Sequence, residues 1–174
     1  MRSLVLTLIG PDRPGVVERI SDCVARHHGN WLGSRMAHLA GQFAGILHLE
    51  VPDEHAVTLR SALDNLQSRD GLRLIVEEAT IPIAQAAGSM VVVDLVGQDR
   101  PGIVSELSEF FASQHLNVEE LATDRENAAM SGEALFRARV RLTVPPTMTI
   151  AELHRGIERL ADDLMVEIRL DEVK

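Results

Sequence analysis

"GPDRPGVV" (residues 10–17) and "GQDRPGIV" (residues 97–104) are nearly the same phrase, written 87 positions apart. Each copy follows a short apolar stretch, at 3–9 and at 89–96, and opens a segment whose apolar residues recur every three or four positions. A short apolar run bounded by glycine predicts a buried strand, and the three- to four-residue spacing predicts an amphipathic helix. The phrase is therefore expected in a loop between a strand and a helix, twice.

The repeat extends along the whole chain. "FAGILHLEVP" (43–52) aligns with "FRARVRLTVP" (136–145) at an offset of 93, so the second copy has six extra residues in its hairpin. Each copy is about 86 residues long, which is a natural domain size. We therefore expect a duplicated domain, with domain 1 at 1–84 and domain 2 at 85–174, joined by the small-residue stretch at 82–89.

Both copies contain the same order of predicted elements: a strand, a helix, two strands, a helix and a strand. The strands are expected at 3–9, 31–40, 43–51 and 72–80, then at 89–96, 118–127, 134–144 and 164–171; the second helices are expected at 54–68 and 149–163. The order β-α-β-β-α-β predicts an α+β, ferredoxin-like fold, with four antiparallel strands and two helices on one face.

Local signals predict where some elements begin and end. Pro14 is expected in the first turn of the first helix and Gly29 at its end. Gly41, together with the next residue, is expected to form the tight turn of the first hairpin. Thr149 begins a capping-box pattern at the last helix.

Composition and charge exclude several classes of protein. The 174 residues carry a formal net charge of −9, so the chain is a poor candidate for direct binding to nucleic acid. The only lysine is Lys174, which leaves no lysine for a phosphate-binding loop or an internal Schiff base. Cys23 is the only cysteine, no apolar run is long enough to span a bilayer, and the N-terminal run is expected to be a strand rather than a signal peptide. A cytoplasmic, globular protein is expected.

No catalytic or metal-binding pattern is present in the sequence. The seven histidines and Cys23 lack the spacing of zinc ligands, and no G-x-S-x-G nucleophile motif occurs. We therefore expect neither a metal nor a cofactor, and a non-catalytic protein. A hydrolase of the acylphosphatase kind is an alternative, since Arg13 and Arg100 could form a phosphate loop with Asn30 and Asn117.

The repeated loop has the chemistry of a small-ligand site. Backbone N–H groups at a helix N-terminus lack partners and attract a carboxylate or phosphate. Gly15 and Gly102 would allow close approach to the first helical turn, and Asp12 and Asp99 place a carboxylate beside it. A free α-amino acid fits both charges. Alternatively, the phrase only starts a helix, because aspartate, proline and glycine are common there.

An asparagine follows the first helix in each copy. Asn30 and Asn117 each begin the second predicted strand, and we expect them to reach the loop from beside it. With Asp12 and Asp99 they would form a polar cluster that the core does not need. The alternative is an asparagine that only ends a helix or forms a turn.

These residues resemble the ACT domain family. "GPDRPGVV…HHGNW" and "GQDRPGIV…QHLNV" match its opening loop, helix and strand-two asparagine, and the resemblance covers nearly the whole chain as two tandem copies. It extends, through "GEALF" (132–136), to tandem proteins of the glycine cleavage system transcriptional repressor type.

The resemblance implies an amino-acid-binding regulator. Ligands of this family usually lie between adjacent ACT units, and the positions carried over are Asp12, Gly15, Asn30, Asp99, Gly102 and Asn117. It implies a small amino acid as ligand, glycine first and serine next, and a protein partner that binds DNA. A homodimer is expected, because four-stranded sheets leave open edges. The longer second hairpin breaks the symmetry, so one site is expected to be specialised or inactive. The rival hypothesis is a protein-interaction adaptor that binds no ligand.

Overall fold

The computed structural model describes residues 1–79, 88–127 and 133–173. The chain forms two compact units, Met1–Ile81 and Pro82–Lys174. The boundary expected between residues 84 and 85 lies outside the described residues. None of the helices in these three ranges is long and apolar enough to cross a membrane.

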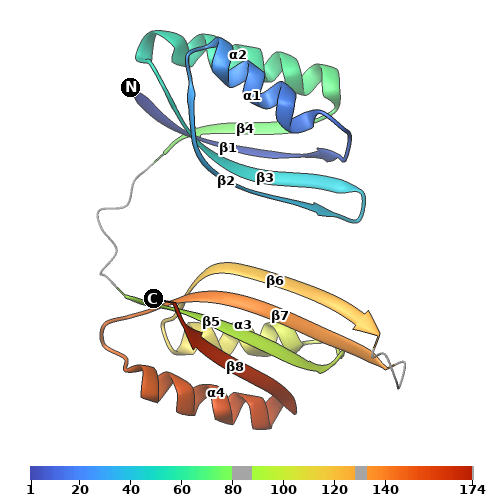
Figure 1. Ribbon diagram of the computed structural model, residues 1–174, viewed down its shortest axis with the longest axis vertical. Coiled ribbons are helices and arrows are strands. Elements are labelled where there is room, and N and C mark those ends of the chain that lie inside the picture. The colour runs from blue at the N-terminus through green and yellow to red at the C-terminus, as the bar shows by residue number, and fades with distance from the viewer. Residues whose placement is uncertain (80–87, 128–132, 174) are drawn as a thin grey trace. The chain divides into compact units, whose positions relative to one another are not determined.

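The first unit has the order β-α-β-β-α-β (Figure 1). Its elements are β1 (Arg2–Pro11), α1 (Val16–Arg26), β2 (Asn30–Leu39), β3 (Gln42–Val51), α2 (Asp53–Asp70) and β4 (Arg73–Glu78). The strands pair antiparallel in the order β2-β3-β1-β4. Both helices cover the same face of this sheet, as Figure 1 shows. The core lies between the two layers, where Leu6 and Leu47 from the sheet meet Ile20 and Leu59 from the helices.

The second unit repeats this arrangement. Its elements are β5 (Ser89–Gln98), α3 (Ile103–Ser113), β6 (Asn117–Asn127), β7 (Ala134–Val144), α4 (Ile150–Leu164) and β8 (Val166–Glu172). The sheet order is β6-β7-β5-β8, the same topology as in the first unit. Val93 and Val140 pack against Leu107 and Ile157 in its core. The predicted α+β, ferredoxin-like fold is confirmed for both units.

The start of α1 differs from the prediction. Helix α1 begins at Val16, and Gly15 is its N-cap residue with φ 85°. Pro14 therefore lies before the cap and not in the first helical turn. Glycine at the cap adopts a left-handed backbone that costs other residues about 1–2 kcal/mol. Gly102 has the same role before α3, with φ 92°, so the phrase repeats a backbone geometry as well as a sequence.

The end of α1 also differs from the prediction. His28, and not Gly29, adopts the left-handed conformation, with φ 57°. The N–H of Gly29 donates to the Val24 carbonyl at 2.9 Å and the N–H of His28 to the Ala25 carbonyl at 3.0 Å. This pair of bonds is a Schellman motif. A side chain on Gly29 would meet Val24 Cγ1 at 2.8 Å, so close packing is the reason for glycine at this position.

Two further local predictions have different outcomes. The tight turn of the first hairpin is formed by Ala40 and Gly41, both at positive φ, one residue earlier than expected. The capping box at α4 is confirmed: Thr149 Oγ1 accepts from the Glu152 N–H, and the Glu152 carboxylate accepts from the Thr149 N–H.

Candidate functional site: the loop before the first helix of each unit

The loop of the first unit is held by its neighbours. The N–H of Asp12 donates to the Gly41 carbonyl at 3.1 Å, which ties the end of β1 to the hairpin turn. Gly15 then turns the chain into α1, and no side chain caps the first turn of this helix. Its backbone N–H groups are therefore left for water or a ligand.

A shallow pocket of about 380 Å³ lies at this loop. It is lined by Asp12, Arg13, Gly15, Val16, Val17, Glu18 and Phe43. The pocket brings an aspartate, an arginine, a free helix N-terminus and one aromatic ring together. This combination can hold a small zwitterion, because the helix end attracts an anion and Asp12 attracts a cation.

The loop of the second unit has the same backbone. The N–H of Asp99 donates to the Ala134 carbonyl at 2.9 Å, and no side chain caps the first turn of α3. The side chains of this loop are arranged differently. Arg125 Nε, on β6, donates to Asp99 Oδ2 at 2.6 Å. Asp99 is therefore neutralised by its own unit.

The arginine of the second loop is also paired. Arg100 donates to both carboxylate oxygens of Glu106, at 2.6 and 2.8 Å. These hydrogen bonds and the positive charge of Arg100 lower the pKa of Glu106. The arginine bridges the loop and the first turn of α3, where a ligand would bind.

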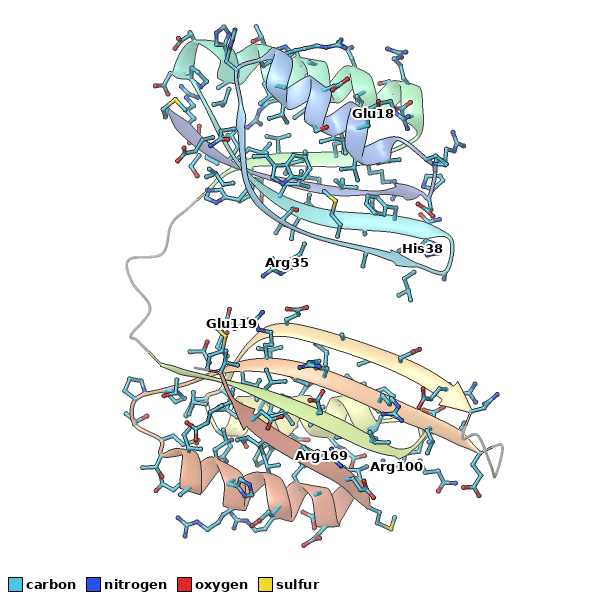
Figure 2. The ribbon with its side chains drawn as sticks, viewed as in Figure 1. Glu18, Arg35, His38, Arg100, Glu119 and Arg169 are labelled. Carbon is cyan, nitrogen blue, oxygen red and sulfur yellow. The ribbon has the colours of Figure 1, made fainter. Side chains whose placement is uncertain are left out.

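The first unit lacks these contacts. Asp12 Oδ2 lies 3.7 Å from His38 Nε2, a longer contact that is an ion pair only when His38 is protonated. Arg13 forms no ion pair with any residue that the structure describes. Figure 2 labels His38 on β2 and, in the other unit, Arg100 before α3. The two loops thus share a backbone conformation but differ in how their charged side chains are paired.

The strand-two asparagines do not lie where the sequence predicted. Asn30 pairs with Glu50, in the row of Ser3, whereas Asp12 follows the last row of β1. Eight residue steps along β3, from Glu50 to Gln42, separate the two rows, a distance of about 26 Å. The predicted polar cluster of loop and asparagine is therefore wrong within one unit. The error arose because, across β3, the start of β2 is level with the start of β1 and not with its end.

The asparagine of the second unit has a local partner. Asn117 Nδ2 donates to Glu119 Oε1 at 2.6 Å, and Thr143 Oγ1 donates to the same oxygen at 2.8 Å. These bonds, that of Thr143 first, lower the pKa of Glu119. The Asn30 side chain has no hydrogen bond to any residue in the described part of the chain.

This placement also removes the geometry that a hydrolase would need. An acylphosphatase-like site requires the loop arginine and the strand-two asparagine together, but Arg13 and Asn30 lie at opposite ends of the sheet. The described residues include no group of three or more histidine, cysteine or acidic side chains placed to hold a metal ion.

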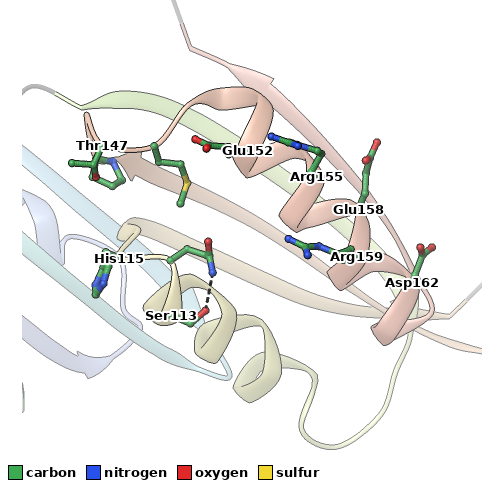
Figure 3. Close-up of a pocket in the computed structure, with 11 residues that line it drawn as sticks. Ser113, His115, Thr147, Glu152, Arg155, Glu158, Arg159 and Asp162 are labelled. Carbon is green, nitrogen blue, oxygen red and sulfur yellow. Dashed lines mark hydrogen bonds between the residues drawn. The ribbon is translucent and has the colours of Figure 1, made fainter.

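Sequence reasoning missed a larger pocket in the second unit, of about 830 Å³ (Figure 3). It lies between the end of α3 and the side of α4, with Ser113 and His115 on one wall and Arg155 and Arg159 on the other. Acidic residues of α4 alternate with these arginines along the helix. The three- to four-residue spacing of charge on α4 was the only signal in the sequence, and it is typical of any solvated helix face.

Comparison with known proteins identifies the first unit. Residues 2–77 match the model of the ACT domain. The N-terminal unit is an ACT domain. The second unit repeats the ACT topology element by element.

The whole chain also resembles several known proteins over most of their length. The glycine cleavage system transcriptional repressor of Escherichia coli is 24% identical over 161 residues, which cover 92% of this chain and 85% of that protein. A crystal structure of an unknown protein from Galdieria sulphuraria superposes with a TM-score of 0.88 at 27% identity, over 99% of both chains. A crystal structure provisionally described as a glycine cleavage system transcriptional repressor has a TM-score of 0.74 at 20% identity, over 99% of this chain and 98% of that one.

Proposed function

We propose that this protein is a non-catalytic regulator that senses a small amino acid at the loop of its first ACT domain. One observation carries the proposal: the charged side chains of the second loop form short ion pairs within their unit, and Asp12 and Arg13 of the first loop form none that short. Asp99 is bound by Arg125 and Arg100 by Glu106, whereas Asp12 has only the 3.7 Å contact with His38. A ligand must displace strong contacts in the second loop but not in the first.

The proposed ligand is an α-amino acid with a small side chain. Its carboxylate would accept hydrogen bonds from the uncapped first turn of α1, and its ammonium group would lie beside Asp12. Glycine is the first candidate and serine the second, because Phe43, Val16 and Val17 leave a shallow pocket. Gly15 and Gly102 would act through their backbone, since each fixes the helix end that would bind a carboxylate.

Asn30 lies too far from the loop of its own unit to complete this site. At about 26 Å from the loop of its own unit, its side chain cannot contact a ligand that this loop holds. Asn117 is held by Glu119 and is the weaker candidate.

The relatives suggest the regulatory context. A protein of the glycine cleavage system transcriptional repressor type would act in the cytoplasm on transcription. With a net charge of −9, this chain would act through a partner protein that itself binds DNA. Ligand binding would change the affinity for that partner only if the two states of the protein bind the amino acid unequally.

Isothermal titration calorimetry tests the proposal. Glycine, serine and larger amino acids are titrated into the full chain and into Asp12→Asn, which removes the charge but keeps the shape. We expect one saturable event for a small amino acid, weakened at least about tenfold by Asp12→Asn. Asp99→Asn is the matched control and should leave that affinity unchanged. No binding across the panel would contradict the sensor and support the ligand-free adaptor.

A further inference from the structure

The pocket between α3 and α4 of the second unit, here called the α3–α4 pocket, has a volume of about 830 Å³. All of its lining residues belong to the second unit, as Figure 3 shows, so its walls do not involve the loop of the first. The two helices approach closely, since a side chain on Gly156 would meet Phe110 Cζ at 3.0 Å. The volume of the pocket lies in the range of small-molecule sites.

Two arginines of the α4 wall lack an acidic partner. Arg155 and Arg159 lie one helical turn apart, a spacing at which two like charges destabilise a helix. Neither forms an ion pair with a residue in the described ranges. Arg155 Nε donates to the Ala151 carbonyl at 3.3 Å, which leaves its two terminal nitrogens for another acceptor. In Figure 3 both arginine side chains extend from α4 toward the same side, so one anion could offset their repulsion.

The first unit does not have these arginines. The buried positions of α2 and α4 align at an offset of 94 residues, which places Arg155 at the position of Ser61 and Arg159 at that of Asn65. Both residues of the first unit are uncharged and lie on an equivalent helix of the same fold. The fold therefore does not require arginine at either position.

A histidine on the opposite wall also differs in its surroundings between the units. In the first unit His28 lies against His55, with ring centroids 4.8 Å apart. His115 occupies the position of His28 and has the same left-handed backbone. Met148 takes the place of His55, since the N–H of each donates to the carbonyl of the proline three residues before it. No aromatic ring of the described residues lies against His115, whose ring nitrogens are thus available to a ligand in the pocket.

The acidic residues of the pocket lining do not neutralise the two arginines. Glu152 Oε2 accepts hydrogen bonds from the Thr149 N–H at 2.9 Å and from the Thr149 hydroxyl at 2.8 Å. The Glu158 carboxylate lies 3.3 Å from His154 Nδ1, also on α4. Figure 3 shows Glu158 and Asp162 pointing away from α3. The part of the pocket that faces α3 is therefore the cationic part.

We propose that the α3–α4 pocket binds a small molecule that carries a phosphate monoester. Two guanidinium groups offer more N–H donors than the two oxygens of one carboxylate can accept, whereas a phosphate has three acceptor oxygens and a higher charge. His115 and Thr147 would add donors from the other walls, and the remaining volume would hold the organic part of the ligand. This site uses no residue of the first loop, so it does not rest on amino-acid binding there.

An NMR titration of the full chain with methyl phosphate tests this site. At constant ionic strength, the amides of His115, Thr147, Arg155 and Arg159 should shift saturably, with half-saturation at about 1 mM. Acetate, which has a single charge and two acceptor oxygens, should bind at least about tenfold more weakly. Equal binding of acetate and methyl phosphate would contradict the assignment of a phosphate ligand.

A double variant locates the binding in the pocket. Arg155→Ser with Arg159→Asn introduces the residues of the first unit and should weaken methyl phosphate binding at least about tenfold. Arg60→Ser with Arg69→Asn makes the same change of charge on α2 and should leave the affinity unchanged. Circular dichroism shows that each variant is folded. Undiminished binding by the pocket variant, or no saturable shift outside the uncapped starts of α1 and α3, would overturn the proposal.

Discussion

Arg125 Nε donates a hydrogen bond to Asp99 Oδ2 at 2.6 Å, and the position of Arg125 in the second unit is held by His38 in the first. The correspondence follows from the register, because Arg125 pairs with Phe136 and His38 pairs with Phe43. Arginine at the position of His38 thus accounts for the pairing of Asp99, and Glu106 at the position of Arg19 accounts for the pairing of Arg100. The two units share the same loop backbone, and the residue opposite the aspartate decides whether its charge is paired.

Pairing Asp12 with a permanent positive charge should reduce amino-acid binding. His38→Arg places a permanent guanidinium beside Asp12, as Arg125 does beside Asp99, and this cation competes with the ligand ammonium. We expect the affinity to fall roughly fivefold, the scale of an exposed ion pair. Calorimetry measures this change. His154→Arg, on the surface of α4, is the control, and an equal loss in that variant would show that the effect is not local.

Removing the two ion pairs of the second loop should create a second amino-acid-binding site. Arg125→His removes the partner of Asp99, and Glu106→Arg removes the partner of Arg100 and introduces the residue found at the equivalent position, Arg19. The calorimetric stoichiometry should rise from one to two ligands per chain. A stoichiometry that stays at one would show that ion pairing does not decide which loop binds.

The left-handed N-cap should make Gly15 sensitive to substitution. Gly15→Ala forces a side chain into φ 85° and should lower the free energy of unfolding of the first unit by about 1–2 kcal/mol. Trp31, the only tryptophan, packs against the core of this unit and reports its urea unfolding by fluorescence. Gly33→Ala is the control, because an added methyl group there meets no atom within 4 Å. Equal effects of the two substitutions would contradict the role of the cap.

The capping box should make the second unit sensitive to substitution and to pH. Thr149→Ala should lower the free energy of unfolding of this unit by about 1 kcal/mol, measured by circular dichroism in urea, while Thr147→Ala outside the helix should change it little.

The Thr149 N–H and hydroxyl donate to Glu152 and lower its pKa. A lowered folded-state pKa stabilises the fold above the ordinary glutamate pKa, and the effect disappears as the pH falls through the lowered value. Thr149→Ala should therefore reduce the pH dependence in this range, and an unchanged profile would contradict it.

Most of the fold could be predicted because the chain repeats itself. The same order of periodicities occurs twice, and each strand was expected within a few residues of where it lies. The errors fall at helix and turn ends, where one residue decides the geometry. His28 takes the left-handed position for which Gly29 was expected, because the close approach to Val24 requires glycine one residue later.

The candidate site was predicted less well than the fold. The loop residues and their helix end are visible in the sequence, because Gly15 and Asp12 occur in a fixed phrase. The position of Asn30 depends on the strand order and on which end of β1 is level with the start of β2 across β3, and periodicity does not answer either question. The pairing of Asp99 with Arg125 spans 26 residues, and no local pattern indicates it.

Amide chemical shifts of the full chain, recorded by NMR during a titration with glycine, test the central claim most directly. A chain of 19.1 kDa is small enough for every loop amide to be followed. The account predicts saturable shifts at Gly15, Val16 and Val17, where the carboxylate would bind, and much smaller ones at Gly102 and the first turn of α3. Shifts confined to the second loop, or no saturable shift at either loop, would contradict it.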